Sequence, residues 1–353
     1  MAVTIGTAPT ALESFFFYRH SLELRYDDAA HVYLLVLPNG QLREVPSVTT
    51  VVKIVDKSDM LVPWGVKMAA EKLLANVPTY VTKAERRMVP AMPYEVFLTL
   101  VTDAKSAHKE RLEDAANVGK DAHSWLQRYI QHQLGLNPVP EPLIEPRAAS
   151  CTQAALDWMQ QHNVRWLQTE RKIYSRQYGY AGTMDGLCLA DSCTNLLCCP
   201  ESFKDSLSLV DWKSSNYLLL TYLLQTASYS QAVTEEFGSV IERRWLVRLG
   251  KADGQFEVWH LGPETQDRDF EGFLACLDLS FTMKDLKARQ AETEDARKEA
   301  AREQKRLAKE AAHRIACPKS KTYKGSRRTV CVDGQMCQAC EKIFLDRHLE
   351  AVQ

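Results

Sequence analysis

An acid and a lysine two residues apart end an apolar segment near the middle of the chain. Leu209 and Val210 are followed directly by Asp211, Trp212 and Lys213. If this segment is a β-strand, Asp211 and Lys213 project to the same face, because strand side chains alternate. A carboxylate there can bind a divalent cation, and an ammonium group beside it can orient or deprotonate an attacking water. The segment therefore predicts metal-assisted hydrolysis of phosphodiesters.

A second acid and a pair of polar residues accompany this strand. Asp185 lies between Gly182 and Gly186, and two glycines so close together would let backbone or substrate approach. Gln225 and Tyr229 are four residues apart, so they share one face of a helix. They would either pack that helix against a sheet or, if buried, find hydrogen-bond partners in the metal site. We favour the second interpretation.

This ordered set of residues resembles the RecB-type branch of the PD-(D/E)XK nuclease superfamily. The resemblance covers residues 26–275, and the segment 45–50 is similar to phage and mitochondrial exonucleases of the same branch. The resemblance implies an α/β fold of the restriction-endonuclease-like type, in which helices flank a mixed central sheet. A long C-terminal helix and a small Cys-rich module would follow that core.

The resemblance also implies a role for each matching residue. The implied catalytic residues are Lys213, Asp185, Asp211 and Glu170. The implied ligands of a Mg²⁺ or Mn²⁺ ion are His123, Asp185, Asp211 and the backbone carbonyl of Trp212. Gln225 and Tyr229 would support the site and contact the nucleic acid. The side chain of Trp212 is expected on the opposite face of the strand, in the core.

Three of the candidate residues need separate comment. Glu170 could instead pair with Arg171 or Lys172, and a single helical histidine such as His123 is often structural. Ser47 is placed to cap a following helix, whose free amides would receive a phosphate. We therefore also expect Ser47 at the substrate.

The cysteines suggest a further metal site near the C-terminus. We expect a Cys₄ zinc site formed by Cys317, Cys331, Cys337 and Cys340, which include one CxxC pair. An iron–sulfur cluster that uses a cysteine far upstream is not expected, because no cysteine precedes Cys151. A second group of cysteines lies upstream, at Cys188, Cys193, Cys198 and Cys199. Because two of these are adjacent, we do not favour a metal site there.

Composition is that of an ordinary globular protein. The chain has 353 residues, of which 45% are hydrophobic and 25% charged. No apolar stretch approaches the roughly 20 residues that span a membrane, and no secretory signal is evident. Ten cysteines without such a signal favour a reducing, intracellular compartment: the cytoplasm, or the host cytoplasm for a phage protein. The net charge of −1 does not by itself indicate nucleic-acid binding.

Hydrophobic periodicity divides the chain into four expected parts. They are an N-terminal hairpin and helical region with the histidine motif (1–150), a nuclease core (151–282), a long charged helix (283–316) and the Cys-rich module (317–353). The expected helices are 63–76, 93–134, 151–168, 220–236 and 264–281. The expected strands are a hairpin within 22–45, then 169–175, 180–190, 206–213, 241–249 and 255–261.

Together these features predict a metal-dependent deoxyribonuclease, most simply an exonuclease in DNA recombination, repair or replication. The resemblance suggests a phage origin and implies that DNA is the substrate. The charged helix and the Cys-rich module would contact a recombination or replication protein. The alternative is a catalytically silent nucleic-acid-binding or assembly protein that uses a nuclease fold.

Overall fold

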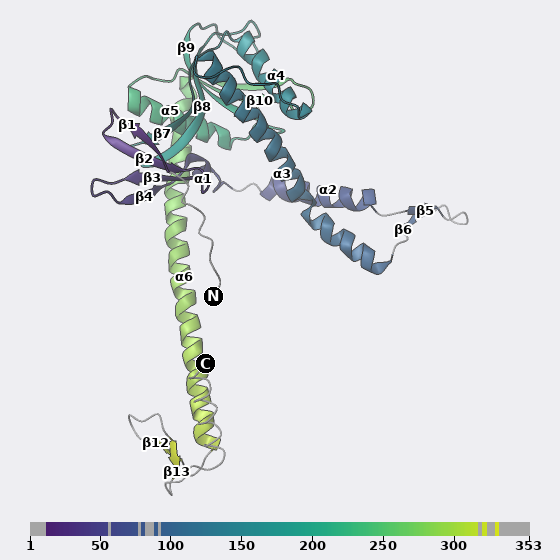
Figure 1. Ribbon diagram of the computed structural model, residues 1–353, viewed down its shortest axis with the longest axis vertical. Coiled ribbons are helices and arrows are strands. Elements are labelled where there is room, and N and C mark those ends of the chain that lie inside the picture. The colour runs from purple at the N-terminus through teal and green to yellow at the C-terminus, as the bar shows by residue number, and fades with distance from the viewer. Residues whose placement is uncertain are drawn as a thin grey trace. The chain divides into compact units, whose positions relative to one another are not determined.

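The computed structural model describes residues 12–55, 58–76, 79–81, 88–90, 93–316, 320–322 and 329–331. The chain divides into two compact units, Met1–Ser280 and Phe281–Gln353. The first unit is a mixed α/β structure with a five-stranded and a four-stranded sheet (Figure 1). Two short hairpins, β5–β6 (Thr79–Val81 and Met88–Pro90) and β12–β13 (Ser320–Thr322 and Thr329–Cys331), complete the strands of the described chain.

The five-stranded sheet has the order β11-β10-β9-β8-β7. Its strands are β7 (Arg165–Ser175), β8 (Tyr180–Ala190), β9 (Ser206–Lys213), β10 (Arg243–Leu249) and β11 (Phe256–Leu261). Only β9 and β10 are parallel; the other neighbours are antiparallel. A parallel pair needs a crossover connection, which here contains helix α5 (Thr221–Phe237). The predicted strands and crossover helix are confirmed, with ends shifted by a few residues.

The four-stranded sheet precedes this core in the chain. It is formed by β1 (Glu13–Phe17), β2 (Leu22–Asp27), β3 (Val32–Val36) and β4 (Leu42–Val45). The predicted turn around Gly40 joins β3 to β4, and Gly40 adopts a positive φ of 78° there. The sheet is tied to β8 by a hydrogen bond of 2.7 Å between the hydroxyls of Tyr33 and Thr183. Strand β1 was not predicted.

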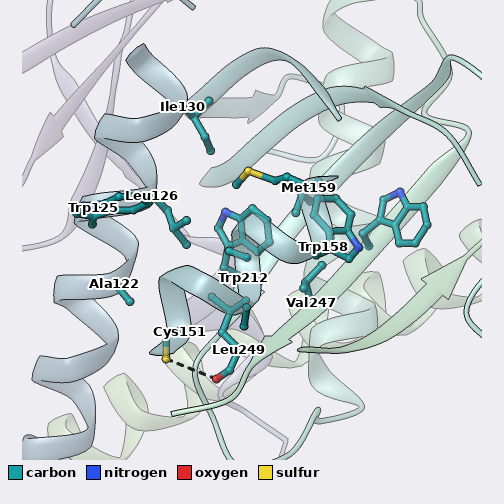
Figure 2. Packing of buried hydrophobic residues seen from close by; sticks show 14 of the residues in the cluster. Ala122, Trp125, Leu126, Ile130, Cys151, Trp158, Met159, Trp212, Val247 and Leu249 are labelled. Atoms are coloured by element: carbon teal, nitrogen blue, oxygen red, sulfur yellow. Dashed lines mark hydrogen bonds between the residues drawn. The ribbon is translucent and has the colours of Figure 1, made fainter. Parts of the chain in front are cut away.

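Helices cover both faces of the five-stranded sheet. On one face, α3 (Tyr94–Gln133) and α4 (Pro146–Gln161) enclose a core with Trp212 of β9 and Val247 of β10, as Figure 2 shows. On the other face, α5 packs with α1 (Val48–Val52) and the first turns of α6 (Gln266–Ala316). Helix α2 (Ser58–Asn76) lies against α3 through an ion pair between Lys72 and Glu110, and a short 3₁₀ turn (Pro263–Thr265) precedes α6.

The predicted helix 151–168 is wrong at both ends. Helix α4 begins at Pro146, after the Glu145 side chain accepts a hydrogen bond from the Ala148 amide. It ends before His162, because Asn163 adopts a φ of +46° and turns the chain into β7. Trp166, expected on the apolar face of the helix, therefore lies on β7 instead.

The two C-terminal helices expected at 264–281 and 283–316 are one continuous helix, α6. Phe270, Phe273 and Leu277 are buried in the core of the first unit. Within the second unit, every helical side chain described, up to residue 308, is exposed. Ion pairs three residues apart, such as Asp295 with Lys298, line this exposed part. No helix in the described part of the chain is both long and apolar enough to cross a bilayer.

Gly182 makes room for an aromatic ring and not, as expected, for backbone or substrate. A Cβ atom on Gly182 would lie 2.7 Å from Cε1 of Tyr229 and 3.3 Å from Val48. Gly186 likewise accommodates Trp166, whose ring would lie 2.4 Å from an added Cβ. The two glycines that flank Asp185 thus allow close packing on β8.

We predict that Gly182→Ala lowers the free energy of unfolding by about 1–3 kcal/mol, because Tyr229 is buried and has little space to move. Chemical denaturation of both proteins measures the difference. Gly65→Ala is the control: a Cβ there meets nothing within 4 Å, and alanine favours the helix. Equal stability of Gly182→Ala and the wild type would contradict this packing.

Candidate functional site

Three carboxylates lie on three neighbouring strands. Glu170 falls between Thr169 and Arg171, which pair with the two neighbours of Asp185 across β7 and β8. On the other side, β8 pairs with β9 up to Gly186 and Val210, which brings Asp185 next to the Asp211 segment. The amide of Trp212 donates a 2.8 Å hydrogen bond to Oδ2 of Asp185 and fixes this alignment. The sheet thus places acids from distant parts of the sequence in one row.

His123 of α3 lies close to two of these acids, Asp185 and Glu170. Its Nδ1 lies 3.8 Å from Oδ2 of Asp185. His123, Glu170 and Asp185 each offer a ligand atom, and these atoms lie within 4.8 Å of one another. No side chain in the described residues forms a salt bridge with Glu170. Two carboxylates and an imidazole converging in this way form a group that can bind a cation.

Lys213 and Asp211 form a close ion pair beside this group. The Lys213 Nζ lies 2.6 Å from Oδ2 of Asp211, and the side chains are 15% and 1% exposed. The prediction that the two share a face of the strand is therefore confirmed. Gln225 extends the pair into α5: its Nε2 donates to Oδ1 of Asp211 at 3.2 Å and lies 3.0 Å from the Tyr229 hydroxyl. Lys213 also lies 4.5 Å from the ring centre of Tyr222.

Burial governs the charges in this site. Desolvation, with the nearby Asp185 carboxylate, raises the pKa of Glu170 to about 8. Desolvation raises the pKa of Asp185 as well, and raises that of Asp211 to about 6 despite the Lys213 charge. The pKa of Lys213 is raised too, because attraction to Asp211 and Asp185 outweighs the cost of burial. Lys213 is therefore an ammonium ion at neutral pH, among acids whose ionisation is unfavourable without a cation.

The same causes keep His123 neutral. Burial and the nearby Lys213 charge lower the pKa of His123 to about 4, although Asp211 and the Trp212 backbone oppose the shift. A neutral imidazole is the form that binds metals. The Trp212 backbone thus meets His123 as well as Asp185. The Trp212 side chain packs away from the site, edge-on to Trp158 at 5.4 Å, as predicted (Figure 2).

Glu170 has an unusual backbone. Its φ is +48°, in the left-handed region that glutamate rarely occupies. Backbone strain of this kind costs on the order of 1–3 kcal/mol and concentrates at functional sites. The observation favours a site role for Glu170. Arg171, one of its expected partners, instead forms an ion pair with Glu236.

Two pockets are lined by other residues of the site. The larger, of about 550 Å³, is lined by His123, Lys213 and Tyr222 and extends to α2 and α3. The smaller, of about 300 Å³, is lined by residues that include Ser47, Lys53 and Tyr229. The Ser47 hydroxyl accepts a hydrogen bond from the Thr50 amide at 3.2 Å and so caps α1, as predicted. Ser47 is thus near Tyr229 but separate from the pocket that contains Lys213.

A second group of metal-binding side chains lies between β8 and β9. His162, Cys193, Cys198 and Cys199 bring their ligand atoms within 4.8 Å of one another and can hold a metal ion. A metal site was not favoured from the four cysteines alone, and the structure replaces Cys188 with His162 in a group that could hold one. Cys188, from the same sequence cluster, is not part of the group and is buried in the core. His162 was missed because it lies far upstream, at the end of α4, and no local motif contains it.

A zinc site was also predicted near the C-terminus. Cys317, Cys337 and Cys340 lie outside the described residues, and of Cys331 only its place in β13 is described. Comparison with known proteins adds no assignment. No protein-family model matches the chain, and a search of curated proteins finds no significant match.

We predict that, without divalent metal, stability falls as pH rises from about 4.5 to about 8. In this range the unfolded chain releases the Glu170 proton while the folded protein retains it, so rising pH favours unfolding. One group contributes a slope of at most about 1.4 kcal/mol per pH unit.

Glu170→Gln should make this decline shallower in denaturant titrations with EDTA. Glu44→Gln changes an exposed strand residue and should leave the decline unchanged. A wild-type slope retained in Glu170→Gln would contradict the assigned pKa.

Proposed function

We propose that the protein is a Mg²⁺- or Mn²⁺-dependent deoxyribonuclease, most simply an exonuclease. The observation that carries the proposal is the convergence of Glu170, Asp185 and His123 beside the buried Asp211–Lys213 ion pair. The five-stranded sheet, with α5 as its crossover, is compatible with the restriction-endonuclease-like fold that the sequence motifs suggest. The proposed family is the RecB-like branch of the PD-(D/E)XK nucleases.

The donor set suits a hard divalent cation. Asp185, Glu170 and, once its ion pair with Lys213 rearranges, Asp211 supply carboxylate oxygens, and His123 supplies a neutral nitrogen. Carboxylates favour Mg²⁺ and Mn²⁺, and an imidazole shifts the preference toward Mn²⁺. When bound, such a metal polarises the phosphate and lowers the pKa of a bound water. A bound cation would also relieve the repulsion among these acids.

Each protein group has a role that follows from its charge. Because Lys213 is an ammonium ion, it would orient the attacking water and neutralise negative charge that develops on the phosphate. Gln225 positions Asp211 and Lys213, since it contacts both side chains. Tyr229 positions Gln225 in turn, through the 3.0 Å contact. The two helical residues thus hold the ion pair in place.

The larger pocket supports a nucleic-acid substrate. Its lining combines cations, Arg111 and Lys251, with the aromatic rings of Trp64, Tyr217 and Tyr222. Cations attract the phosphate backbone, and aromatic rings stack on bases. This mixture beside Lys213 favours a DNA strand over a small phosphate ester. The exposed part of α6 would bind a partner protein.

We predict that Lys213→Ala and Asp185→Ala reduce cleavage of end-labelled DNA by on the order of 10²-fold or more, because each removes charge stabilisation at the phosphate. DNA affinity, measured by fluorescence anisotropy in EDTA, should persist. Lys67→Ala, which changes an exposed lysine, should cleave like the wild type. Cleavage by Lys213→Ala at the wild-type rate would refute the assignment.

The wild type with and without Mg²⁺ or Mn²⁺ provides the companion measurement. Metal-dependent loss of the labelled end supports an exonuclease. DNA binding without cleavage in either metal would favour the non-enzymatic alternative. Substrates blocked at the 5′ or the 3′ end then give the polarity of digestion.

We further predict that His123→Gln raises the Mn²⁺ concentration for half-maximal cleavage by on the order of 10-fold or more, because a metal ligand is lost. Cleavage at saturating Mn²⁺ should be less affected. A metal titration of the cleavage rate measures both values. His108 lies on the same helix, so His108→Gln is the matched control. An unchanged metal dependence in His123→Gln would exclude the histidine as a ligand.

A further inference from the structure

The loop between β8 and β9 contains three cysteines that face the end of α4. This loop, Asp191–Asp205, has no helix or strand of its own. Loops longer than about 12–15 residues without secondary structure are uncommon in compact folds, and this one is near that limit. Its base is closed by backbone hydrogen bonds, from Ser192 to the Phe203 carbonyl and from Asp191 to the His162 carbonyl. Beyond that base, Phe203 packs against Trp245 and His260. The side chains of Cys193, Cys198 and Cys199 converge separately with that of His162.

The distances in this group match a tetrahedral metal site. The Sγ atom of Cys199 lies 3.6 Å from that of Cys193 and 3.9 Å from that of Cys198. A tetrahedral zinc ion with Zn–S bonds of about 2.3 Å separates two sulfurs by about 3.8 Å. These separations are too long for a disulfide, whose S–S bond is about 2.05 Å.

The histidine has the expected distance and orientation. Its Nε2 lies 3.6 Å from Sγ of Cys198, the sulfur–nitrogen spacing of about 3.6 Å that tetrahedral zinc would impose. Its Nδ1 lies 3.0 Å from the Asp191 carbonyl, which fixes the proton on Nδ1 and leaves Nε2 as the ligand. The ring is fully buried and packs against Trp158 and Trp245, at centroid distances of 5.4 and 4.7 Å. The imidazole is therefore held in position.

One backbone amide points at a sulfur of this group. The amide of Cys193 lies 3.4 Å from Sγ of Cys199 and points its hydrogen at the sulfur. Such a donor stabilises negative charge on a metal-bound sulfur. The donor set of three sulfurs and one imidazole is soft, and structural zinc sites of the Cys₃His type have all four positions occupied by protein.

We propose that His162, Cys193, Cys198 and Cys199 bind one structural zinc ion that fastens the β8–β9 loop to the end of α4. The ion leaves no coordination position open for a substrate. Its role is to fix the connection between the two strands that also carry Asp185 and Asp211. The inference does not depend on the proposed nuclease activity, because it rests on a separate group of residues.

Cysteine-resolved alkylation of the full-length protein tests the site and separates it from the C-terminal cysteines. With zinc bound, Cys193, Cys198 and Cys199 should react with iodoacetamide on the order of 10-fold or more slowly than after EDTA treatment. Cys276, a partly exposed cysteine outside the group, should react equally in both conditions. Mass spectrometry of the peptides gives each rate. Equal rates for the three cysteines with and without EDTA would overturn the proposal.

Metal analysis of variants gives the stoichiometry. Cys198→Ser and His162→Asn should each lose one zinc equivalent per chain, whereas Cys276→Ser should lose none. Asparagine retains a hydrogen-bond donor for the Asp191 carbonyl, and Cys198 is only partly buried, so both variants are expected to fold. If one of them fails to fold, the other still tests the site. Iron in place of zinc, unchanged zinc content in both variants, or a Cys193–Cys199 disulfide in freshly reduced protein would each contradict a zinc site.

Discussion

The central constraint on this molecule is the placement of three carboxylates on adjacent strands, one of them fully buried and two partly buried. Glu170, Asp185 and Asp211 are brought together by strand pairing, and burial opposes their ionisation. Lys213 forms a direct ion pair in this row, and the nearby charge of Lys172 opposes the rise in the pKa of Glu170. Two ammonium groups do not balance three acids whose ionisation burial opposes, so the arrangement is costly unless a further cation binds or some acids stay protonated. A fold that retains this cost is more simply explained by function than by stability.

The packing of the sheet shows how the row is held in place. Trp212 separates Asp211 from Lys213 in the sequence, but its side chain enters the opposite core and anchors β9 there. Its backbone amide faces the site and donates a hydrogen bond to Asp185. The glycines on either side of Asp185 admit Tyr229 from one helix and Trp166 from the neighbouring strand. Aromatic packing and acid placement therefore depend on the same short segment of β8.

Much of this arrangement was predictable from the sequence, because its signals are local. Alternation gave β8 and β9 their correct limits, and the i to i+4 spacing placed Gln225 and Tyr229 together on α5. The boundary of α4 was not predictable from periodicity, since it depends on the left-handed conformation of Asn163. The His162 site was missed for a different reason. Its ligands come from two elements, and only the tertiary fold shows that the end of α4 meets the β8–β9 loop.

The two candidate metal groups differ in chemistry in a way that would keep their metals apart. The group around Asp185 offers oxygens and one imidazole next to an open pocket, which suits a labile hard cation. The group around Cys199 offers three sulfurs and one imidazole, with its histidine buried, which suits tightly held zinc. Both groups involve the β8–β9 hairpin, one along its strands and the other in its connecting loop. Zinc would thus stabilise the hairpin without competing for the carboxylates, because thiolates bind it far more strongly than they bind Mg²⁺ or Mn²⁺.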